Sequence, residues 1–266
     1  MFYPFKIDIS IIEEMQRSTN TVVGSDYIKE EEKRKGLRKA DLKQYLNTTD
    51  GIIDGKSLKE LWFPKGKYQV FLSHSSSDLD KARYFKCWLE TLCGLRCFID
   101  ADVWDNAYGL LREIDNKYKE KGSTSYDYQV RNQTTAHVYS MLTMALFEAI
   151  DEIECPILIE SKNSVALDEG ITQGTLSPWI YEEVGFMGKL PHRIPERFLR
   201  TRTFSVGTES VMLNESVSDS VTMIHPLDTT GFKRIERADL NAMSSYQGEK
   251  ALDKLYRKRL LLKRVL

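Results

Sequence analysis

The sequence predicts an α/β fold built on a doubly wound, mainly parallel sheet. Three short apolar runs, at residues 68–72, 95–99 and 157–159, have the length and composition of buried strands. Helical patterns separate them, one over residues 79–93 and one ending near residue 153. Strands that are apolar along their whole length and alternate with helices favour parallel pairing through right-handed crossovers.

The composition predicts a soluble protein with a folded core. The chain has 266 residues and 41% hydrophobic residues, enough for one full domain with extensions. Its 38 basic and 39 acidic residues nearly cancel, which gives no electrostatic reason to expect a nucleic acid or a membrane as partner. No apolar run approaches the roughly 20 residues of a membrane span, and the first residues lack the layout of a signal peptide.

The cysteines point to a reducing compartment. Four are present, and none has the spacing of a metal site. They lie within periodic apolar segments, so we expect four buried free thiols, Cys87, Cys93, Cys97 and Cys155. We therefore expect a cytoplasmic protein with no bound metal.

The chain divides into three predicted parts. Residues 1–65 form a mostly helical extension, in which apolar positions 37, 42, 45 and 46 suggest one narrow helical stripe. Residues 66–232 hold the α/β domain, with a long charged loop after residue 100 that reaches about residue 131, and with further candidate strands at 203–206 and 221–224. Residues 233–266 form a helical C-terminal extension that ends in a basic helix from about Gly248.

The loops after the strands are where chemistry is expected, because ligands of such sheets bind beyond the carboxyl ends of the strands, near the switch in strand order. The first loop, residues 73–78, carries Ser73, His74 and Ser75 and lacks the glycines of a phosphate-binding loop. Asp100 ends the second strand, and the nearby Asp102 and Asp105 follow that same strand, so they do not predict a magnesium site. No Gly-x-Ser-x-Gly elbow supports a serine hydrolase.

A later helix carries the strongest candidate. Ser177 suits the N-cap and Pro178 the first helical position. At about 100° per residue, Trp179 and Glu183 fall on one side of this helix, beside an apolar stripe of Ile180, Val184 and Met187. Glu183 therefore lies at the margin of the buried face and Glu182 points toward solvent. A carboxylate beside an indole is a candidate active-site group, and an amphipathic helix with a rim glutamate is the alternative.

In their order along the chain, the run Tyr68 to Ser76, the second strand ending in Ile-Asp, and the Ser-Pro-Trp-Ile-Tyr-Glu-Glu helix resemble a bacterial Toll/interleukin-1 receptor (TIR) domain over about residues 67–232. The resemblance implies a flavodoxin-like sheet. The spacing Trp179-x-x-x-Glu183 is similar to the signature of the family's NAD-cleaving members, which makes Glu183 the catalytic glutamate. Residues 101–116 correspond to the family's assembly loop, here longer and more charged.

The implied reaction is cleavage of the nicotinamide–ribose bond of NAD⁺, which is a substrate and not a cofactor. Nicotinamide leaves as a neutral molecule, so the second carboxylate that glycosidases use as an acid is not needed. One glutamate can hold the ribose hydroxyls and stabilise an oxocarbenium-like transition state. The product is ADP-ribose or a cyclic isomer. The residues expected to bind the substrate are Trp179, Ser73, His74, Ser75, Tyr181, Asp100 and Trp104.

The same resemblance implies a biological setting and partners. Bacterial TIR proteins without membrane segments are similar to the signal-producing enzymes of anti-phage systems such as Thoeris, which act on a separate nucleotide-sensing effector. We therefore expect a homo-oligomer formed through TIR–TIR contacts. Two alternatives stay open at this point. One is a non-catalytic TIR interaction module, and the other is an N-ribosyl hydrolase or transferase that acts on a different nucleoside.

Overall fold

A computed structural model of the chain describes residues 1–18, 41–42, 45–46, 52–104, 106–118, 127–168, 171–199 and 223–260. These residues belong to two compact units, one made of residues 1–23, 67–97 and 150–266 and the other of residues 24–66 and 98–149. The strands are β1 (Phe5–Asp8), β2 (Val70–Ser73), β3 (Cys97–Phe98), β4 (Cys155–Glu160), β5 (Ala166–Asp168), β6 (Ile171–Thr175), β7 (His225–Pro226) and β8 (Lys233–Ile235).

The helices of the first unit are α1 (Ile9–Ser18), the 3-10 turn η1 (Ser76–Asp78), α4 (Leu79–Cys93), α8 (Pro178–Lys189), α9 (Glu196–Leu199), α10 (Arg237–Met243) and α11 (Glu249–Arg259). The helices with described bounds in the second unit are α3 (Gly55–Trp62), α5 (Asp100–Val103), α6 (Ala107–Tyr118) and α7 (Tyr128–Glu152); residues 150–152 of α7 are assigned to the first unit.

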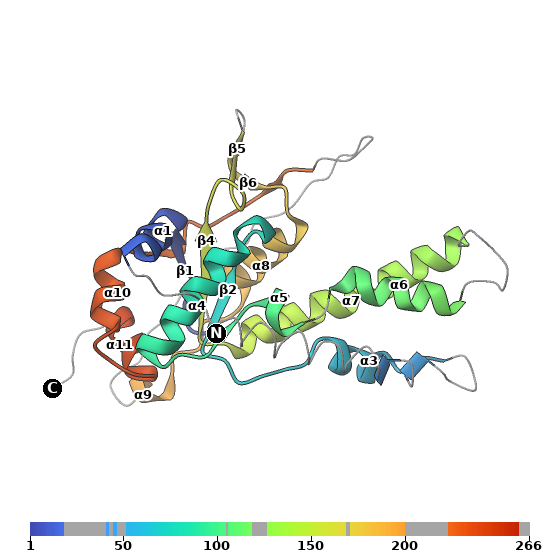
Figure 1. Cartoon of the computed structure of the whole chain (residues 1–266), viewed down its shortest axis with the longest axis horizontal. Coiled ribbons are helices and arrows are strands. Elements are labelled where there is room, and N and C mark those ends of the chain that lie inside the picture. Colours follow the sequence, from blue (N-terminus) through green and yellow to red (C-terminus); the bar gives the residue numbers. More distant parts are fainter. Residues whose placement is uncertain are drawn as a thin grey trace. The chain divides into compact units, whose positions relative to one another are not determined.

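The described strands form a five-stranded parallel sheet in the order β3-β2-β4-β1-β8 (Figure 1). β2 pairs with β4 so that Ser73 lies opposite Leu158, and β4 pairs with β1 so that Glu160 lies opposite Asp8. The predicted α/β class with a parallel sheet is confirmed. Among the three strands predicted from the sequence, β2, β3 and β4, the order β3-β2-β4 is compatible with a flavodoxin-like sheet, because the second of them lies on one side of the first and the third on the other. The insertion of β1 between β4 and β8 is an addition to that order.

The central strand β1 differs from the sequence prediction. It comes from residues 1–65, which we expected to form a helical extension, yet it lies between β4 and β8 in the sheet. Phe5 and Ile7 are fully buried, whereas Lys6 and Asp8 are only half-buried. β8, at the edge, likewise comes from the predicted C-terminal extension. A four-residue strand contains too few positions for its alternation to stand out from a mixed sequence.

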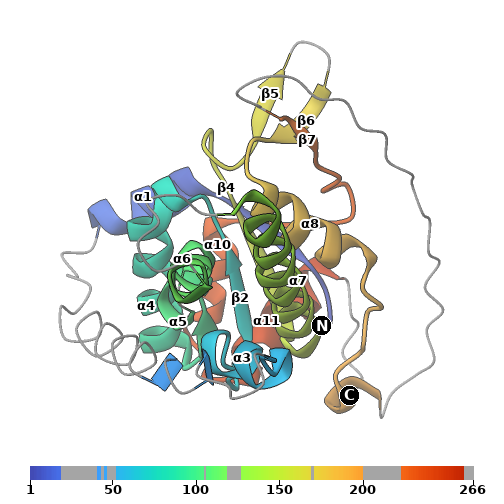
Figure 2. The same ribbon diagram turned by 90° about the vertical axis from the view of Figure 1, so that its right-hand side faces the viewer.

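Helices cover both faces of this sheet. In Figure 2, α1 and α4 lie on one side of β2 and β4, and α8 lies on the other. The connection from β2 through α4 to β3 and the connection from β4 through α8 to β8 run in opposite directions across the sheet, so right-handed crossovers require opposite faces. The predicted helix 79–93 is confirmed as α4, which ends at Gly94 in the left-handed conformation (φ 62°).

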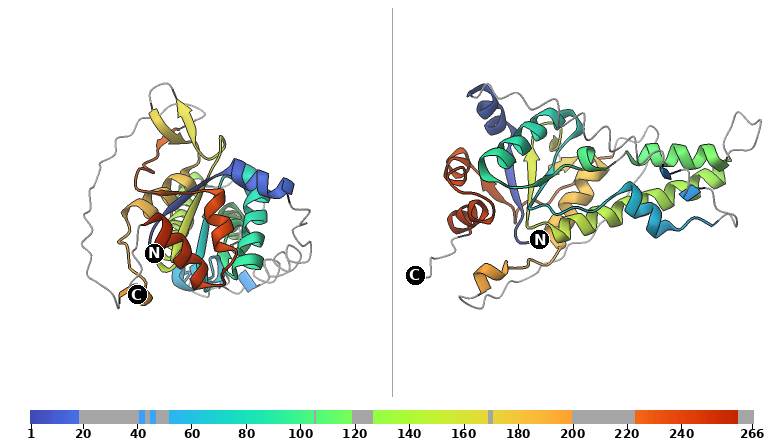
Figure 3. Two further views of the ribbon diagram at one scale, coloured as in Figure 1. Left: turned by 90° about the vertical axis from the view of Figure 1, so that its left-hand side faces the viewer. Right: turned by 60° about the horizontal axis from the view of Figure 1, so that its bottom comes forward.

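The C-terminal helices α10 and α11 pack on each other (Figure 3). The predicted basic helix after Gly248 is confirmed as α11, whose fully buried Tyr256 stacks on Phe5 of β1 with ring centroids 5.9 Å apart. Asp239 of α10 is buried and accepts ion pairs from Lys258 (2.7 Å) and Arg259 (2.5 Å). Burial opposes its charge, but hydrogen bonds from Arg259, Lys258 and the Glu236 backbone outweigh burial and hold the pKa of Asp239 below its usual value.

We expect Asp239→Asn to lower the free energy of unfolding by about 2 kcal/mol at neutral pH, because it removes charge-assisted hydrogen bonds from a buried site. The folded-state pKa lies below the unfolded value of about 3.9, so the contribution is complete above that value and is lost as the pH falls toward the folded-state pKa. Urea unfolding at neutral pH and at about pH 3 checks this. The prediction would be contradicted if the difference in the free energy of unfolding between Asp239→Asn and the wild type were the same at both pH values. It would also be contradicted if Asp80→Asn, at an exposed position, lowered the free energy of unfolding equally.

The second unit corrects one prediction. The expected long loop after residue 100 contains two helices, α5 and α6, so residues 101–116 are largely helical. α6 buries Leu110, Leu111 and Ile114, a short apolar stripe among many charges. Trp62 is fully buried and its indole N–H donates to the Asn106 carbonyl (3.3 Å). This tertiary contact joins the end of α3 to the start of α6, a helix whose sequence alone is strongly polar.

Several predictions fall wholly or partly outside the described residues. The candidate strand 203–206 is outside them, as are residues 221–222, and the neighbouring His225 and Pro226 form β7. β7 joins β5 and β6 in a small antiparallel sheet. Of the predicted stripe at 37, 42, 45 and 46, Leu42 and Leu46 are buried and Tyr45 is 39% exposed. All four cysteines are free; three are buried, while Cys87 is only half-buried. Within the described ranges, no helix combines the length and apolar character of a membrane span.

Candidate functional site

The site forms where α8 meets the carboxyl end of β2. The hydroxyl of Ser73, the last residue of β2, donates a hydrogen bond to Oε2 of Glu183 over 2.5 Å. Both residues are buried, with exposed fractions of 1% and 4%. Residues 110 positions apart thus bring a carboxylate to the carboxyl edge of the sheet, the edge at which ligands of such folds bind.

The local sequence explains how α8 presents Glu183. The Ser177 hydroxyl accepts a hydrogen bond from the Ile180 N–H (3.3 Å), and Pro178 occupies the first turn, as predicted. Ile180, Val184 and Met187 are buried, so their stripe turns the helix toward the sheet. Glu183 is carried further inward than predicted, because it is buried and not at the rim. Glu182 is half-buried.

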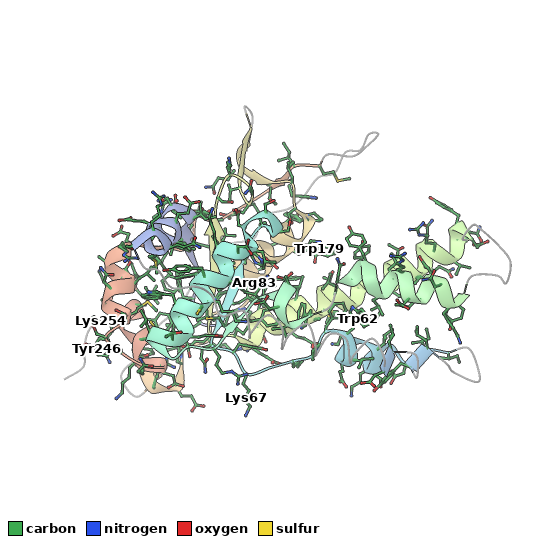
Figure 4. The ribbon with its side chains drawn as sticks, viewed as in Figure 1. Trp62, Lys67, Arg83, Trp179, Tyr246 and Lys254 are labelled. Atoms are coloured by element: carbon green, nitrogen blue, oxygen red, sulfur yellow. The ribbon has the colours of Figure 1, made fainter. Side chains whose placement is uncertain are left out.

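The two aromatic residues of α8 lie in different surroundings. Trp179 precedes Glu183 by four residues, so both project from the same face of the helix; Figure 4 labels Trp179, which is half-buried. Tyr181 precedes Glu183 by two residues and therefore faces another direction. Its ring stacks on His225 of β7, with centroids 4.6 Å apart and an interplanar angle of 22°. The helix thus brings Trp179 toward Glu183 but does not bring Tyr181 there.

The loop after β2 holds the other predicted polar residues. His74 is half-buried and its Nδ1 lies 3.2 Å from the Leu72 carbonyl oxygen. Because a carbonyl oxygen only accepts, this contact requires the proton on Nδ1 and leaves Nε2 as the acceptor of the neutral ring. Ser75 is also half-buried, and its carbonyl accepts from the Asp78 N–H (2.8 Å). Both residues directly follow Ser73, and each has a side-chain polar atom suited to a hydroxyl-bearing ligand.

A third group at this edge was not among the predicted site residues. After β4, the hydroxyl of Ser161 donates to Oδ2 of Asp78 (2.5 Å), and the amide of Asn163 donates to Oδ1 (2.9 Å). Asp78 is 5% exposed. The loop after residue 159 was named as a place to look for chemistry, but its polar run gives no sign of the partner that lies more than 80 residues earlier.

Asp100 and Trp104 belong to the second unit. Asp100 begins α5, and its carbonyl accepts from the Trp104 N–H (2.8 Å). Trp104 is buried, donates its indole N–H to the Pro64 carbonyl (3.1 Å), and packs edge-on against Phe63 and Phe98. These contacts account for Trp104 as a packing residue of its unit. Its predicted contact with a substrate, and that of Asp100, stay predictions.

Chemically, the first unit presents a buried carboxylate held by a hydroxyl, with an indole on the same helix face. A carboxylate in a buried position stabilises a developing positive charge more strongly than one in water. Within the described ranges, no group of three or more His, Cys, Asp or Glu side chains is arranged to hold a metal ion.

Comparison of the chain with protein-family models, with curated proteins and with solved structures gives no match.

Proposed function

We propose that this chain is an NAD-cleaving enzyme of the TIR type in which Glu183 is the catalytic carboxylate. The observation that carries the proposal is the buried hydrogen bond from Ser73 to Glu183 at the carboxyl end of β2. It joins the two predicted motifs, the Ser-His-Ser loop and the Trp179-x-x-x-Glu183 helix, at one edge of a parallel sheet. A glutamate that served only to cap or solubilise a helix would not need to be buried there.

In the proposed reaction the bond between ribose C1′ and the nicotinamide nitrogen breaks, and its electron pair leaves with the neutral nicotinamide. The positive charge passes to the ribose ring, where the Glu183 carboxylate stabilises it. Water then bonds to C1′ and loses a proton, which gives ADP-ribose. A nitrogen of the adenine or a ribose hydroxyl of the same molecule, bonding in its place, gives a cyclic isomer.

The neighbouring side chains have proposed roles in binding. Trp179 provides an aromatic surface for the nicotinamide or ribose on the same helix face as Glu183. His74 accepts a hydrogen bond from a ribose hydroxyl through Nε2, and Ser75 offers a hydroxyl from the same loop. Ser73 is proposed to orient Glu183 and not to bind the substrate itself, because its hydroxyl already donates a hydrogen bond to that carboxylate. Tyr181 supports β7 through His225.

The family resemblance extends the proposal to a setting. A TIR enzyme of this kind acts as a cytoplasmic homo-oligomer in anti-phage defence, and its cyclic or linear product activates a separate nucleotide-sensing effector. We include self-association because the TIR proteins that it resembles act in assemblies. Activity is then expected to depend on protein concentration.

The test is product analysis with NAD⁺ across a dilution series of the purified protein, ending at the highest soluble concentration. Nicotinamide together with ADP-ribose or an isomeric cyclic product is expected, and more product per molecule at higher concentration. No nicotinamide at any concentration would contradict the proposal and favour a non-catalytic interaction module. Release of the base from other nucleosides, but not from NAD⁺, would favour the alternative N-ribosyl hydrolase or transferase.

A further inference from the structure

Asp78 joins two loops that border the proposed site. It is the last residue of η1, directly before α4, and its carboxylate is buried. One of its oxygens accepts from Ser161 and the other from Asn163, at 2.5 and 2.9 Å. Both carboxylate oxygens are therefore used in a bridge between the loop after β2 and the loop after β4.

The partner loop is a rigid anchor in its own right. The hydroxyl of Ser161 accepts from the N–H groups of Asn163 (3.0 Å) and Ser164 (3.1 Å). The buried Ser164 hydroxyl donates to the Ile159 carbonyl (2.9 Å) and accepts from the Ser161 N–H (2.8 Å). Residues 161–164 thus form a hydrogen-bonded turn that is joined to the end of β4 through the Ile159 carbonyl. Asp78 accepts its two hydrogen bonds from this turn.

This bridge fixes one end of the loop that carries His74 and Ser75. The other end is fixed by Ser73, which lies in β2 and donates to Glu183. Only residues 74–77 lie between the two anchors, and Ser76 and Ser77 among them are exposed. The loop of residues 74–77 also lies at a switch in strand order. Its strand, β2, is the neighbour of β4 in the sheet, and the connections that leave these two strands run in opposite directions across the sheet.

We infer that Asp78 is a positioning residue, which holds residues 74–77 in the conformation that binds the ribose portion of the substrate. The inference rests on the proposed function. Glu183 lies on α8, and the bond from Ser73 is independent of Asp78. Loss of the bridge therefore weakens substrate binding and leaves the bond-breaking step nearly intact. The expected signature is a rise in KM for NAD⁺ with little change in kcat.

The test uses Asp78→Asn, which keeps the size of the side chain but turns an amide N–H₂ toward one of the two donors. Asp80→Asn is the matched control, since it makes the same change two residues away on an exposed position. The rescue is the double variant Asp78→Asn/Asn163→Asp, which exchanges donor and acceptor and restores the pair. Thermal unfolding of all four proteins confirms that each is folded.

Two readouts are compared, hydrogen exchange of the amides at 74–78 and 161–164, and steady-state kinetics with NAD⁺. Asp78→Asn is expected to speed exchange in both segments and to raise KM about 10-fold, the loss of roughly one charge-assisted hydrogen bond. The control should leave both readouts at the wild-type level, and the double variant should recover them.

The outcomes separate this inference from the proposed function. An active wild type whose KM does not move in Asp78→Asn would overturn the positioning role, even if exchange increases. Unchanged exchange would show that Asp78 does not hold the loops and would also overturn it. A wild type that releases no nicotinamide would contradict the proposed function itself, and the substrate part of this inference with it.

Discussion

Glu183→Gln is expected to reduce nicotinamide release from NAD⁺ by about 10²-fold or more, the usual cost of removing a group that stabilises charge in a transition state. The substitution keeps the shape of the side chain and an acceptor for the Ser73 hydroxyl, but removes the negative charge that faces the developing cation. Glu182→Gln makes the same chemical change one residue away and is expected to keep the wild-type rate. Nicotinamide release measured for both variants, at equal protein concentration, is the deciding comparison.

Two further measurements test whether the loss of activity in Glu183→Gln comes from the carboxylate itself and not from a change in folding. Ser73→Ala removes the donor to Glu183 and is expected to reduce the rate by about 10-fold, since a hydrogen bond to a charged group contributes roughly 1.5–3 kcal/mol. Thermal unfolding of each variant shows whether the fold is kept. Equal turnover by Glu183→Gln and the wild type would remove Glu183 from the mechanism, and equal losses in both glutamate variants would indicate a general effect of charge.

Phe5→Ala is expected to lower the free energy of unfolding by about 3–5 kcal/mol, the cost of removing a fully buried aromatic ring. Phe5 lies in β1, between β4 and β8, and its ring contacts Tyr256 and Tyr3. Replacing a residue in a peripheral extension would lower the free energy of unfolding far less. The size of the effect therefore tests whether β1 lies in the interior of the sheet. Urea unfolding followed by circular dichroism gives the measurement.

The matched control for Phe5→Ala is Ile52→Ala. Ile52 comes from the same predicted extension, residues 1–65, but its side chain is 71% exposed. Surface substitutions of this kind usually change stability by about 0.5 kcal/mol or less. Similar small effects at both positions would contradict the interior placement of β1.

The elements that the sequence predicts well are those with strong local signals. α4 runs from Leu79 to Cys93 as expected, because its apolar residues keep helical spacing over several turns and Gly94 marks its end. α8 begins at Pro178 for a similarly local reason, the Ser-Pro cap. β2 and β4 follow from apolar runs that are bounded by polar loops. In each case neighbours along the chain supply most of the information.

The missed elements depend on distant partners. β1 is recognisable only once β4 and β8 supply its hydrogen bonds, because four residues do not establish a period. α6 has the spacing of a short helix, but charges surround its apolar stripe, and contacts from distant residues, such as the hydrogen bond from the buried Trp62 to the Asn106 carbonyl, complete its unit. Burial in tertiary structure, and not intrinsic preference, decides the conformation of such segments.

By itself, the sequence determined the α/β class, the position of α8, and which of its two glutamates lies nearer the buried face, since helical periodicity alone separates Glu183 from Glu182. Only the tertiary structure decided that Glu183 is buried against Ser73, that Asp78 bridges two loops, and that the first residues of the chain enter the sheet. The physical reason is that periodicity reports which face of an element is buried. The partner on that face is chosen by packing and hydrogen bonding between residues that are far apart in the chain.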